Sequence, residues 1–394
     1  MSAAIRKVYR KRRTQRKLEH YLDNSSTTKP CKEAVEAALD AMTHTFGNPS
    51  SLHALGFAAS RALEDARESV AAVLGVSRAE ITFTSGGTEA NNLAIFGAYE
   101  ARKKRGRRVV TTAIEHPSVL NPMKELEKRG AEVVYVKPDG DGRISPEVLA
   151  QAVTPDTVLV SLMAVNNEVG TVLPIDAAHA AIVRTKAPAL LHVDAVQAFG
   201  KLPLKPSRRG IDLLTVSAHK IHGLKGTGAL YIRKGVHILP HTFGGGQERD
   251  VRPGTEGMPG ILAFGAACRA LPDPQKEAKA IEALNARVRA GLQVLPDVTV
   301  LSPADASPYV LSFSAGRVRA QTMLNFLSAR GVYVSSGSAC AKGAESHVLK
   351  AMGLSKDQID SALRVSFSRD NTEEDCDALL SALAEGMRTL QAAR

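Results

Sequence analysis

The 394-residue chain has 44% hydrophobic and 23% charged residues, a balance typical of globular proteins, and it is too long for one core of ordinary size. No window approaches the roughly 18 consecutive apolar residues of a membrane span, and the N-terminus lacks an apolar signal segment. The formal net charge of +11 is concentrated in residues 1–20, where eight Lys or Arg face one Glu, which leaves +4 for the other 374 residues. These features predict a cytoplasmic protein of two domains with no membrane contact and no nucleic-acid-binding face.

Residues 1–20 are therefore predicted to form a flexible basic extension. Contact with RNA, contact with an acidic partner and simple solvation all remain open for this segment, and any direct nucleic-acid binding is expected only here.

The four cysteines are widely separated and form no C-x-x-C pair. This spacing indicates neither a zinc site nor a disulfide framework, and it fits a reducing compartment. No resident metal is expected. The cysteines are Cys31, Cys268, Cys340 and Cys376.

Folded sequence is predicted to begin at Tyr21, followed by helices over 30–42 and 56–74. Short β-branched runs then alternate with amphipathic stretches, which is the pattern of a mostly parallel sheet covered by helices. The predicted strands are 81–84, 108–112, 131–136, 157–163, 190–193 and 211–216.

The pattern changes after about residue 260 and predicts a smaller α+β domain. Its predicted elements are one long helix over 260–295, strands at 298–301 and 309–313, and helices over 320–330 and 372–393. The expected division is an extension over 1–20, a large domain over 21–262, whose first residues pack with the second domain, and a small domain over 263–394.

Polar residues follow several of the predicted strands directly. Lys220 comes soon after the strand ending at Val216, and Asp194 ends another strand. Strand C-termini in parallel sheets are where ligands bind. A surface lysine is the commoner interpretation of any one lysine, but this placement favours a Schiff-base lysine, with Asp194 keeping a pyridine nitrogen protonated.

A phosphate site is predicted beside them. Gly86, Gly87 and Thr88 form a glycine-rich turn at the start of a helix, where main-chain N–H groups favour an anion. Ser217 and His219 could close its other side, and Gln197 could donate to a ring hydroxyl. The cluster 244–255 has the glycine content of a loop that approaches a ligand or another subunit.

His116 and Cys340 complete the candidate site. A lone histidine is more often a capping or surface residue, but His116 lies just past the strand ending at Thr112, where it could stack on a ring. Cys340 ends the run Ser-Ser-Gly-Ser-Ala-Cys, in which small residues give the access that a nucleophilic thiol needs. A structural thiol is the alternative for any single cysteine.

Taken together, these residues resemble the cysteine desulfurases of the NifS/IscS type, in the class V aminotransferase superfamily. The resemblance runs from about Tyr21 to the C-terminal helix. It rests on the segments 21–28, 46–50, 84–89, 115–116, 165–168, 192–194, 219–220, 244–246 and 335–340.

The resemblance implies the pyridoxal-phosphate-dependent transferase fold of type I, an α/β fold whose large domain carries a mostly parallel seven-stranded sheet beside a smaller α+β domain. The implied catalytic residues are Lys220, which holds pyridoxal phosphate, Cys340, which accepts sulfur, and His116, which stacks on the ring. The resemblance also implies contacts to the pyridine ring from Asp194 and Gln197, and to the phosphate from Gly87, Thr88, Ser217 and His219. It implies that Thr255 reaches the phosphate of the neighbouring subunit and that Asn167 and Arg364 bind the substrate.

The implied activity is removal of sulfur from L-cysteine to give L-alanine and a persulfide on Cys340. The implied enzyme is a homodimer, and its persulfide passes to an acceptor protein, either an iron–sulfur scaffold or a tRNA-thiolation enzyme. Cys340 is expected to carry the persulfide, or an iron–sulfur cluster, only transiently. The segment 341–347 after Cys340 looks shorter than in some desulfurases, which leaves the identity of the acceptor protein open. A second departure from the family pattern is Gly87, which stands where alanine is common.

Two alternatives remain. One is another class V enzyme, an aminotransferase or a selenocysteine lyase, in which Cys340 is incidental. The other is a sulfur-trafficking or RNA-associated scaffold that has lost catalysis, which predicts missing cofactor residues.

Overall fold

The computed structural model describes residues 19–336 and 345–390. Cys340 and the basic segment up to residue 18 lie outside the described residues. None of the described helices combines the length and the apolar character that crossing a membrane would require.

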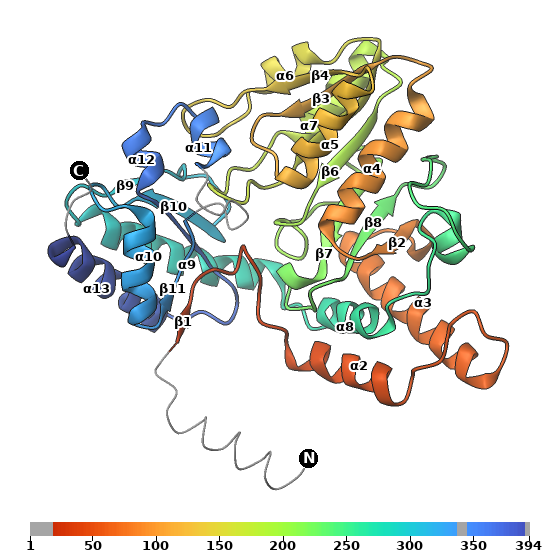
Figure 1. The fold of residues 1–394 in the computed structure, drawn as a ribbon, viewed down its shortest axis with the longest axis horizontal. Coiled ribbons are helices and arrows are strands. Elements are labelled where there is room, and N and C mark those ends of the chain that lie inside the picture. Colours follow the sequence, from red (N-terminus) through yellow and green to blue (C-terminus); the bar gives the residue numbers. More distant parts are fainter. Residues whose placement is uncertain (1–18, 337–344, 391–394) are drawn as a thin grey trace, which may run out of the picture.

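A seven-stranded sheet forms the centre of the larger part of the molecule (Figure 1). Its order is β2-β8-β7-β6-β5-β3-β4, and only β8 runs against its neighbours, so the prediction of a mostly parallel sheet is confirmed. The strands are β2 (Ile81–Thr84), β3 (Arg108–Thr112), β4 (Glu132–Val136), β5 (Thr157–Met163), β6 (Leu190–Asp194), β7 (Leu213–Ser217) and β8 (Gly228–Ile232).

Helices cover both faces of this sheet because both faces are apolar. Successive side chains of a strand point to opposite faces, and Leu213 and Leu214 of β7 accordingly belong to different core clusters. One face packs against α4 and α5, and the other against α3, α6, α7 and α8, with α2 packed on the outer side of α8. The helices are α2 (Lys32–Thr43), α3 (Ala54–Leu74), α4 (Gly87–Arg102), α5 (Pro117–Lys128), α6 (Pro146–Ala152), α7 (Ile175–Thr185) and α8 (Met258–Arg269).

The predicted helix over 260–295 is wrong as a single element. The chain forms α8 and then α9 (Pro274–Gln293), separated by four residues that include Pro272. Asp273 caps α9 by accepting hydrogen bonds from the main-chain N–H groups of Gln275 and Lys276. Proline lacks the N–H that a helix interior uses, so the prolines of this segment end one helix and start the next.

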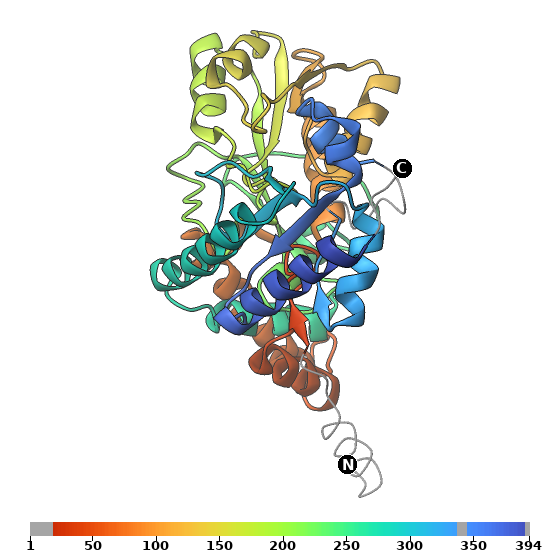
Figure 2. The ribbon, with the colours of Figure 1, turned by 90° about the vertical axis from the view of Figure 1, so that its left-hand side faces the viewer.

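A three-stranded antiparallel sheet, β12-β10-β9, forms the second core together with α9, α10 and α13. In Figure 2, α10 and α13 are blue and α9 is teal, and all three lie at the front. The remaining elements are β9 (Thr299–Val300), β10 (Val310–Ser314), α10 (Ala320–Ala329), β11 (Val332–Tyr333), α11 (His347–Ala351), α12 (Lys356–Asp360), β12 (Ala362–Ser366) and α13 (Glu373–Thr389).

The N-terminal segment connects the two sheets. β1 (His20–Tyr21) pairs in parallel with β11, and Leu22 is buried in the second core. Asp23 then forms a bridge with Ser366, and Thr28 donates its main-chain N–H to the carbonyl oxygen of His219 at 2.9 Å. Residues 23–28 therefore lie between β12 and the end of β7.

Candidate active site

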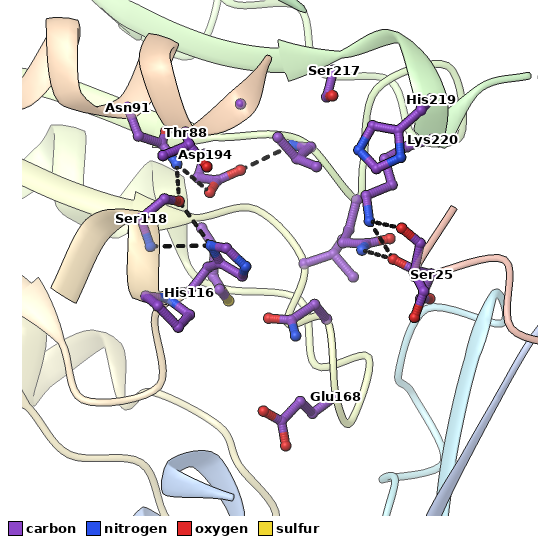
Figure 3. Close-up of a pocket in the computed structure, with 18 of the residues that line it drawn as sticks. Ser25, Thr88, Asn91, His116, Ser118, Glu168, Asp194, Ser217, His219 and Lys220 are labelled. Carbon is purple, nitrogen blue, oxygen red and sulfur yellow. Dashed lines mark hydrogen bonds between the residues drawn. The ribbon is translucent and has the colours of Figure 1, made fainter. Parts of the chain in front are cut away.

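A cavity of about 270 Å³ lies where the parallel strands end and the 23–28 segment crosses them. Figure 3 shows Lys220 and His219 on one side of it and His116 with Ser118 on the other. Ten of the predicted site residues line this cavity: Gly87, Thr88, His116, Asn167, Asp194, Gln197, Ser217, His219, Lys220 and Arg364.

Two predicted residues are not part of the cavity as described. Thr255 is exposed and does not line it. Cys340 lies outside the described residues, so its place relative to the cavity stays a prediction.

Lys220 is held at the cavity by the N-terminal segment. Its Nζ donates to the main-chain oxygens of Ser25 and, at 2.8 Å, Ser26. Burial lowers the pKa of Lys220 to about 7, helped by the positive charges of Arg364 and Lys201. A lysine with such a pKa is partly neutral near pH 7 and can act as a nucleophile or base.

Asp194 ends β6 with both carboxylate oxygens held. One accepts from the side chain of Asn91 at 2.8 Å and the other from the main-chain N–H of Val196 at 3.0 Å. Asn91 also donates to the Ser118 hydroxyl at 2.8 Å, and that hydroxyl lies 2.8 Å from Nδ1 of His116. A continuous hydrogen-bonded chain therefore fixes the carboxylate relative to the imidazole.

His116 both caps a helix and lines the cavity. Its Nδ1 accepts from the main-chain N–H of Ser118 at 3.1 Å at the start of α5, so this residue has the commoner capping role and also lines the cavity. Burial lowers the pKa of His116, with Asp194 opposing and Lys220 adding to the shift. The ring is therefore neutral near pH 7.

The turn between β2 and α4 brings main chain close to the end of β6. A Cβ at Gly87 would lie 2.9 Å from Cγ2 of Val196, which gives a steric reason for glycine at this position. Gly86 has a φ of +149°, a conformation that favours glycine. The N-terminus of α4 thus opens onto the cavity beside Ser217 and His219.

His219 contacts the N-terminal segment and carries no charge near pH 7. Its Nδ1 lies 3.1 Å from the Thr27 hydroxyl. Burial lowers its pKa to about 4, and Lys220 and Lys225 add to the shift. A neutral imidazole can donate one hydrogen bond to an anion without adding positive charge beside Lys220.

Arg364 lies on β12 and is buried. Its guanidinium donates to the carbonyl oxygen of Asn167 at 2.8 Å, to the Asp23 carboxylate at 2.9 Å and to the Ser26 hydroxyl at 2.8 Å. These contacts hold a fixed positive charge on the cavity wall that belongs to the second sheet.

Several site residues were missed from sequence. Asn91 lies in the second turn of α4 and Ser118 in the first turn of α5, and Ser25 and Ser26 hold Lys220. The one local signal available was that Asn91 shares a helical face with the apolar residues Ala94, Ile95 and Ala98.

The model of the class V aminotransferase family matches residues 20–379 of this chain. The chain is 41% identical over 376 residues to cysteine desulfurase 2 of Trichormus variabilis, covering 94% of each protein. It is also similar to a solved NifS-like protein, with a TM-score of 0.89, 40% identity and coverage of 95% of this chain and 100% of the other.

A structure of SspA in complex with cysteine matches with a TM-score of 0.79 and 33% identity, covering 88% of this chain and 98% of that one. The chain therefore belongs to the class V aminotransferase family, whose enzymes depend on pyridoxal phosphate, and within it to the cysteine desulfurases of the NifS/IscS type.

Proposed function

We propose that this protein uses pyridoxal phosphate to convert L-cysteine to L-alanine and leaves the sulfur as a persulfide on Cys340. The observation that carries the proposal is the meeting of Lys220, Asp194 and Arg364 around one cavity. The relative from Trichormus variabilis is named a cysteine desulfurase, and the SspA structure holds cysteine.

The residues present fit pyridoxal phosphate. The side-chain oxygen of Gln197 is buried without a hydrogen-bond partner among the described residues, as expected of a group that faces a ligand. Gly87 leaves room at the N-terminus of α4, where a phosphate would meet main-chain N–H groups. Lys220 would hold the aldehyde, Asp194 the pyridine nitrogen, and Thr88, Ser217 and His219 the phosphate.

When bound, pyridoxal phosphate supplies the electron withdrawal that weakens the Cα–H and Cβ–S bonds of the amino acid. Arg364 binds the carboxylate of L-cysteine, for which a guanidinium fork is suited. Lys220, with its pKa near 7, accepts the proton from Cα. His116 would lie against the ring as a neutral imidazole.

In the sulfur transfer, the Cys340 thiolate attacks the sulfur of L-cysteine. An S–S bond forms, the Cβ–S bond breaks, and its electron pair remains on Cβ, which is then protonated. The net reaction turns L-cysteine and a thiol into L-alanine and a persulfide, and it needs no external oxidant or reductant.

We further propose a homodimer with a large domain over 21–262 and a small domain over 263–394. Thr255 would then reach the phosphate of the neighbouring subunit, which fits its exposure outside this chain's cavity. An apolar face on α2, α3 and the intervening loop would lie in the interface. Its exposed members are Val35, Leu39, Met42, Phe46, Leu52, Leu55 and Phe57.

The persulfide would pass to an acceptor protein, an iron–sulfur scaffold or a tRNA-thiolation enzyme. The cytoplasm is the proposed compartment.

The proposed function is tested by product analysis of the purified, pyridoxal-phosphate-loaded protein supplied with L-cysteine and dithiothreitol. We expect sulfide and L-alanine in equal amounts, without any requirement for a 2-oxo acid. Alanine that appears only when pyruvate is added, with no sulfide, would identify an aminotransferase instead.

Replacement of Arg364 by glutamine is expected to lower kcat/KM for L-cysteine about 10- to 100-fold, the scale of a lost charge-assisted hydrogen bond. The loss should appear mainly in KM, because the carboxylate is bound throughout the reaction. L-cysteine methyl ester lacks the carboxylate charge and serves as the matched control. An equal loss with ester and acid would show that Arg364 acts through Asp23 and Ser26 instead.

The rate at which cofactor-free protein captures pyridoxal phosphate should follow the neutral fraction of Lys220. With a pKa of about 7, the rate is expected to rise with pH and to level off above about pH 8. An unperturbed lysine, with a pKa of about 10.4, would give a rate that still rises beyond pH 9. Stopped-flow absorbance of the bound cofactor between pH 6 and pH 10 distinguishes the two.

A further inference from the structure

Glu168 is a buried carboxylate of the active-site cavity that the proposed chemistry does not use. It is 2% exposed and lies at the opposite end of the site from Ser217 (Figure 3). Within residues 19–336 and 345–390, it forms no ion pair. Its Oε2 instead accepts a hydrogen bond of 2.5 Å from the hydroxyl of Ser346. Burying a carboxylate is costly unless its hydrogen bonds compensate, so this contact requires an explanation.

Ser346 is the N-cap of α11, which is the first described element after the segment that contains Cys340. Its hydroxyl accepts from the main-chain N–H of Leu349 at 3.1 Å while it donates to Glu168. The next residue, His347, places Nε2 2.8 Å from the carbonyl oxygen of Glu115, and because a carbonyl only accepts, Nε2 is the donor. Two consecutive side chains therefore hold the start of α11 against the site.

The groups that receive these bonds are themselves fixed. Asn166 accepts from the main-chain N–H groups of Glu168 at 2.9 Å and Val169 at 3.0 Å. The same side chain donates to the carbonyl oxygen of Ile114 at 2.9 Å, next to Glu115. The start of α11, the turn that carries Asn167 and the residues before His116 thus form one hydrogen-bonded unit.

The chain just before the segment that contains Cys340 is also bound to a cavity residue. The main-chain N–H of Ser335 donates to the carbonyl oxygen of Arg364 at 3.1 Å, and the reverse bond measures 2.7 Å. Cys340 follows Ser335 by five residues and precedes Ser346 by six. An extended chain spans at most about 3.6 Å per residue, so the Cα of Cys340 stays within about 18 Å of Ser335 and about 22 Å of Ser346.

We propose that Glu168 is a positioning residue for sulfur transfer: by holding Ser346 it keeps the start of α11, six residues after Cys340, at the cavity. The inference rests on the proposed desulfurase function. Without this bond, the first hydrogen-bonded restraint that the structure describes after Cys340 is His347, one residue further along the chain, while the Ser335 contact remains on the N-terminal side. The looser hold lowers the effective concentration of the thiol at the substrate sulfur. Proton transfer by Lys220 involves neither Glu168 nor α11 and should continue.

The test compares two rates in the pyridoxal-phosphate-loaded enzyme. Exchange of the Cα proton of L-alanine with deuterium reports on Lys220, and single-turnover formation of persulfide on Cys340, read by mass spectrometry, reports on sulfur transfer. In Glu168→Ala we expect persulfide formation to fall at least about tenfold, the scale of losing a hydrogen bond to a charged group, with proton exchange within about twofold of wild type.

Two matched variants separate this effect from folding. Glu168→Gln keeps an oxygen acceptor for Ser346 and should recover most of the persulfide rate. Ser355→Ala removes the corresponding cap of α12, where the hydroxyl accepts from Gln358 at 3.3 Å away from the cavity, and should leave both rates unchanged.

Ser346→Ala should reproduce the effect of Glu168→Ala, and the double variant should lose no more than either single one. Hydrogen exchange of the α11 amides should quicken in Glu168→Ala but not in Ser355→Ala.

A parallel fall of both rates in Glu168→Ala, or an unchanged persulfide rate, would overturn the positioning role while leaving the desulfurase function intact. Wild-type protein that exchanges the Cα proton but forms no persulfide would overturn the proposed function, and this inference with it.

Discussion

Replacement of Cys340 by alanine is expected to lower the rates at which persulfide, sulfide and L-alanine form from L-cysteine by at least about 10³-fold. This is the scale of removing a covalent nucleophile. We expect no other thiol to complete the S–S bond in its place. Exchange of the Cα proton should persist, because the proposed mechanism assigns that step to Lys220. The measurement is product release and proton exchange on the same preparation.

The other cysteines provide the control for this variant. Burial raises the pKa of Cys268 and raises that of Cys376 to about 11, so neither forms the thiolate that attacks sulfur. Cys31 is partly exposed but lines a different hollow, with Tyr21 and Lys225. Cys31→Ala should therefore keep full activity. Activity that survives in Cys340→Ala and disappears in Cys31→Ala would move the nucleophile to Cys31.

The central sheet could be predicted because its strands are runs of branched apolar residues, and β5, at Thr157–Met163, is buried at every position. The strand β8 was missed, since Gly228 and Ala229 give its start little strand character. The single helix predicted over 260–295 failed for a local reason, the prolines at 272 and 274.

Much of the site could be predicted because parallel strands end at one edge of a sheet. Asp194 and Ser217 end β6 and β7, and Lys220 follows within three residues, so their convergence on one cavity follows from topology.

Contacts made between distant segments could not be read in the same way. Arg364 reaches Asp23 across 341 positions of sequence, and Ser346 reaches Glu168 across 178. Neither pairing leaves a local pattern in the sequence. Long-range hydrogen bonds depend on how the two sheets are joined, and that information appears only in the folded chain.

Replacement of Lys220 by alanine is expected to prevent covalent capture of pyridoxal phosphate and to lower the rate of Cα-proton exchange by about 10²- to 10⁴-fold, the range for a lost acid–base group. Reduction of the loaded protein with borohydride, followed by peptide mass analysis, should place the cofactor on Lys220 in wild type. Lys220→Ala should carry no label, and Lys225→Ala, which removes an exposed lysine nearby, should be labelled like wild type.

A low pKa alone does not select this lysine. Burial also lowers the pKa of Lys201, to about 8, but its Nζ lies 5.1 Å from the centre of the Tyr309 ring and it does not line the cavity. If amine basicity decided the reaction, both lysines would be labelled. If the cavity decides it, by placing Lys220 opposite Asp194 and beside the N-terminus of α4, label will appear at Lys220 alone, and label at Lys201 would contradict the assignment.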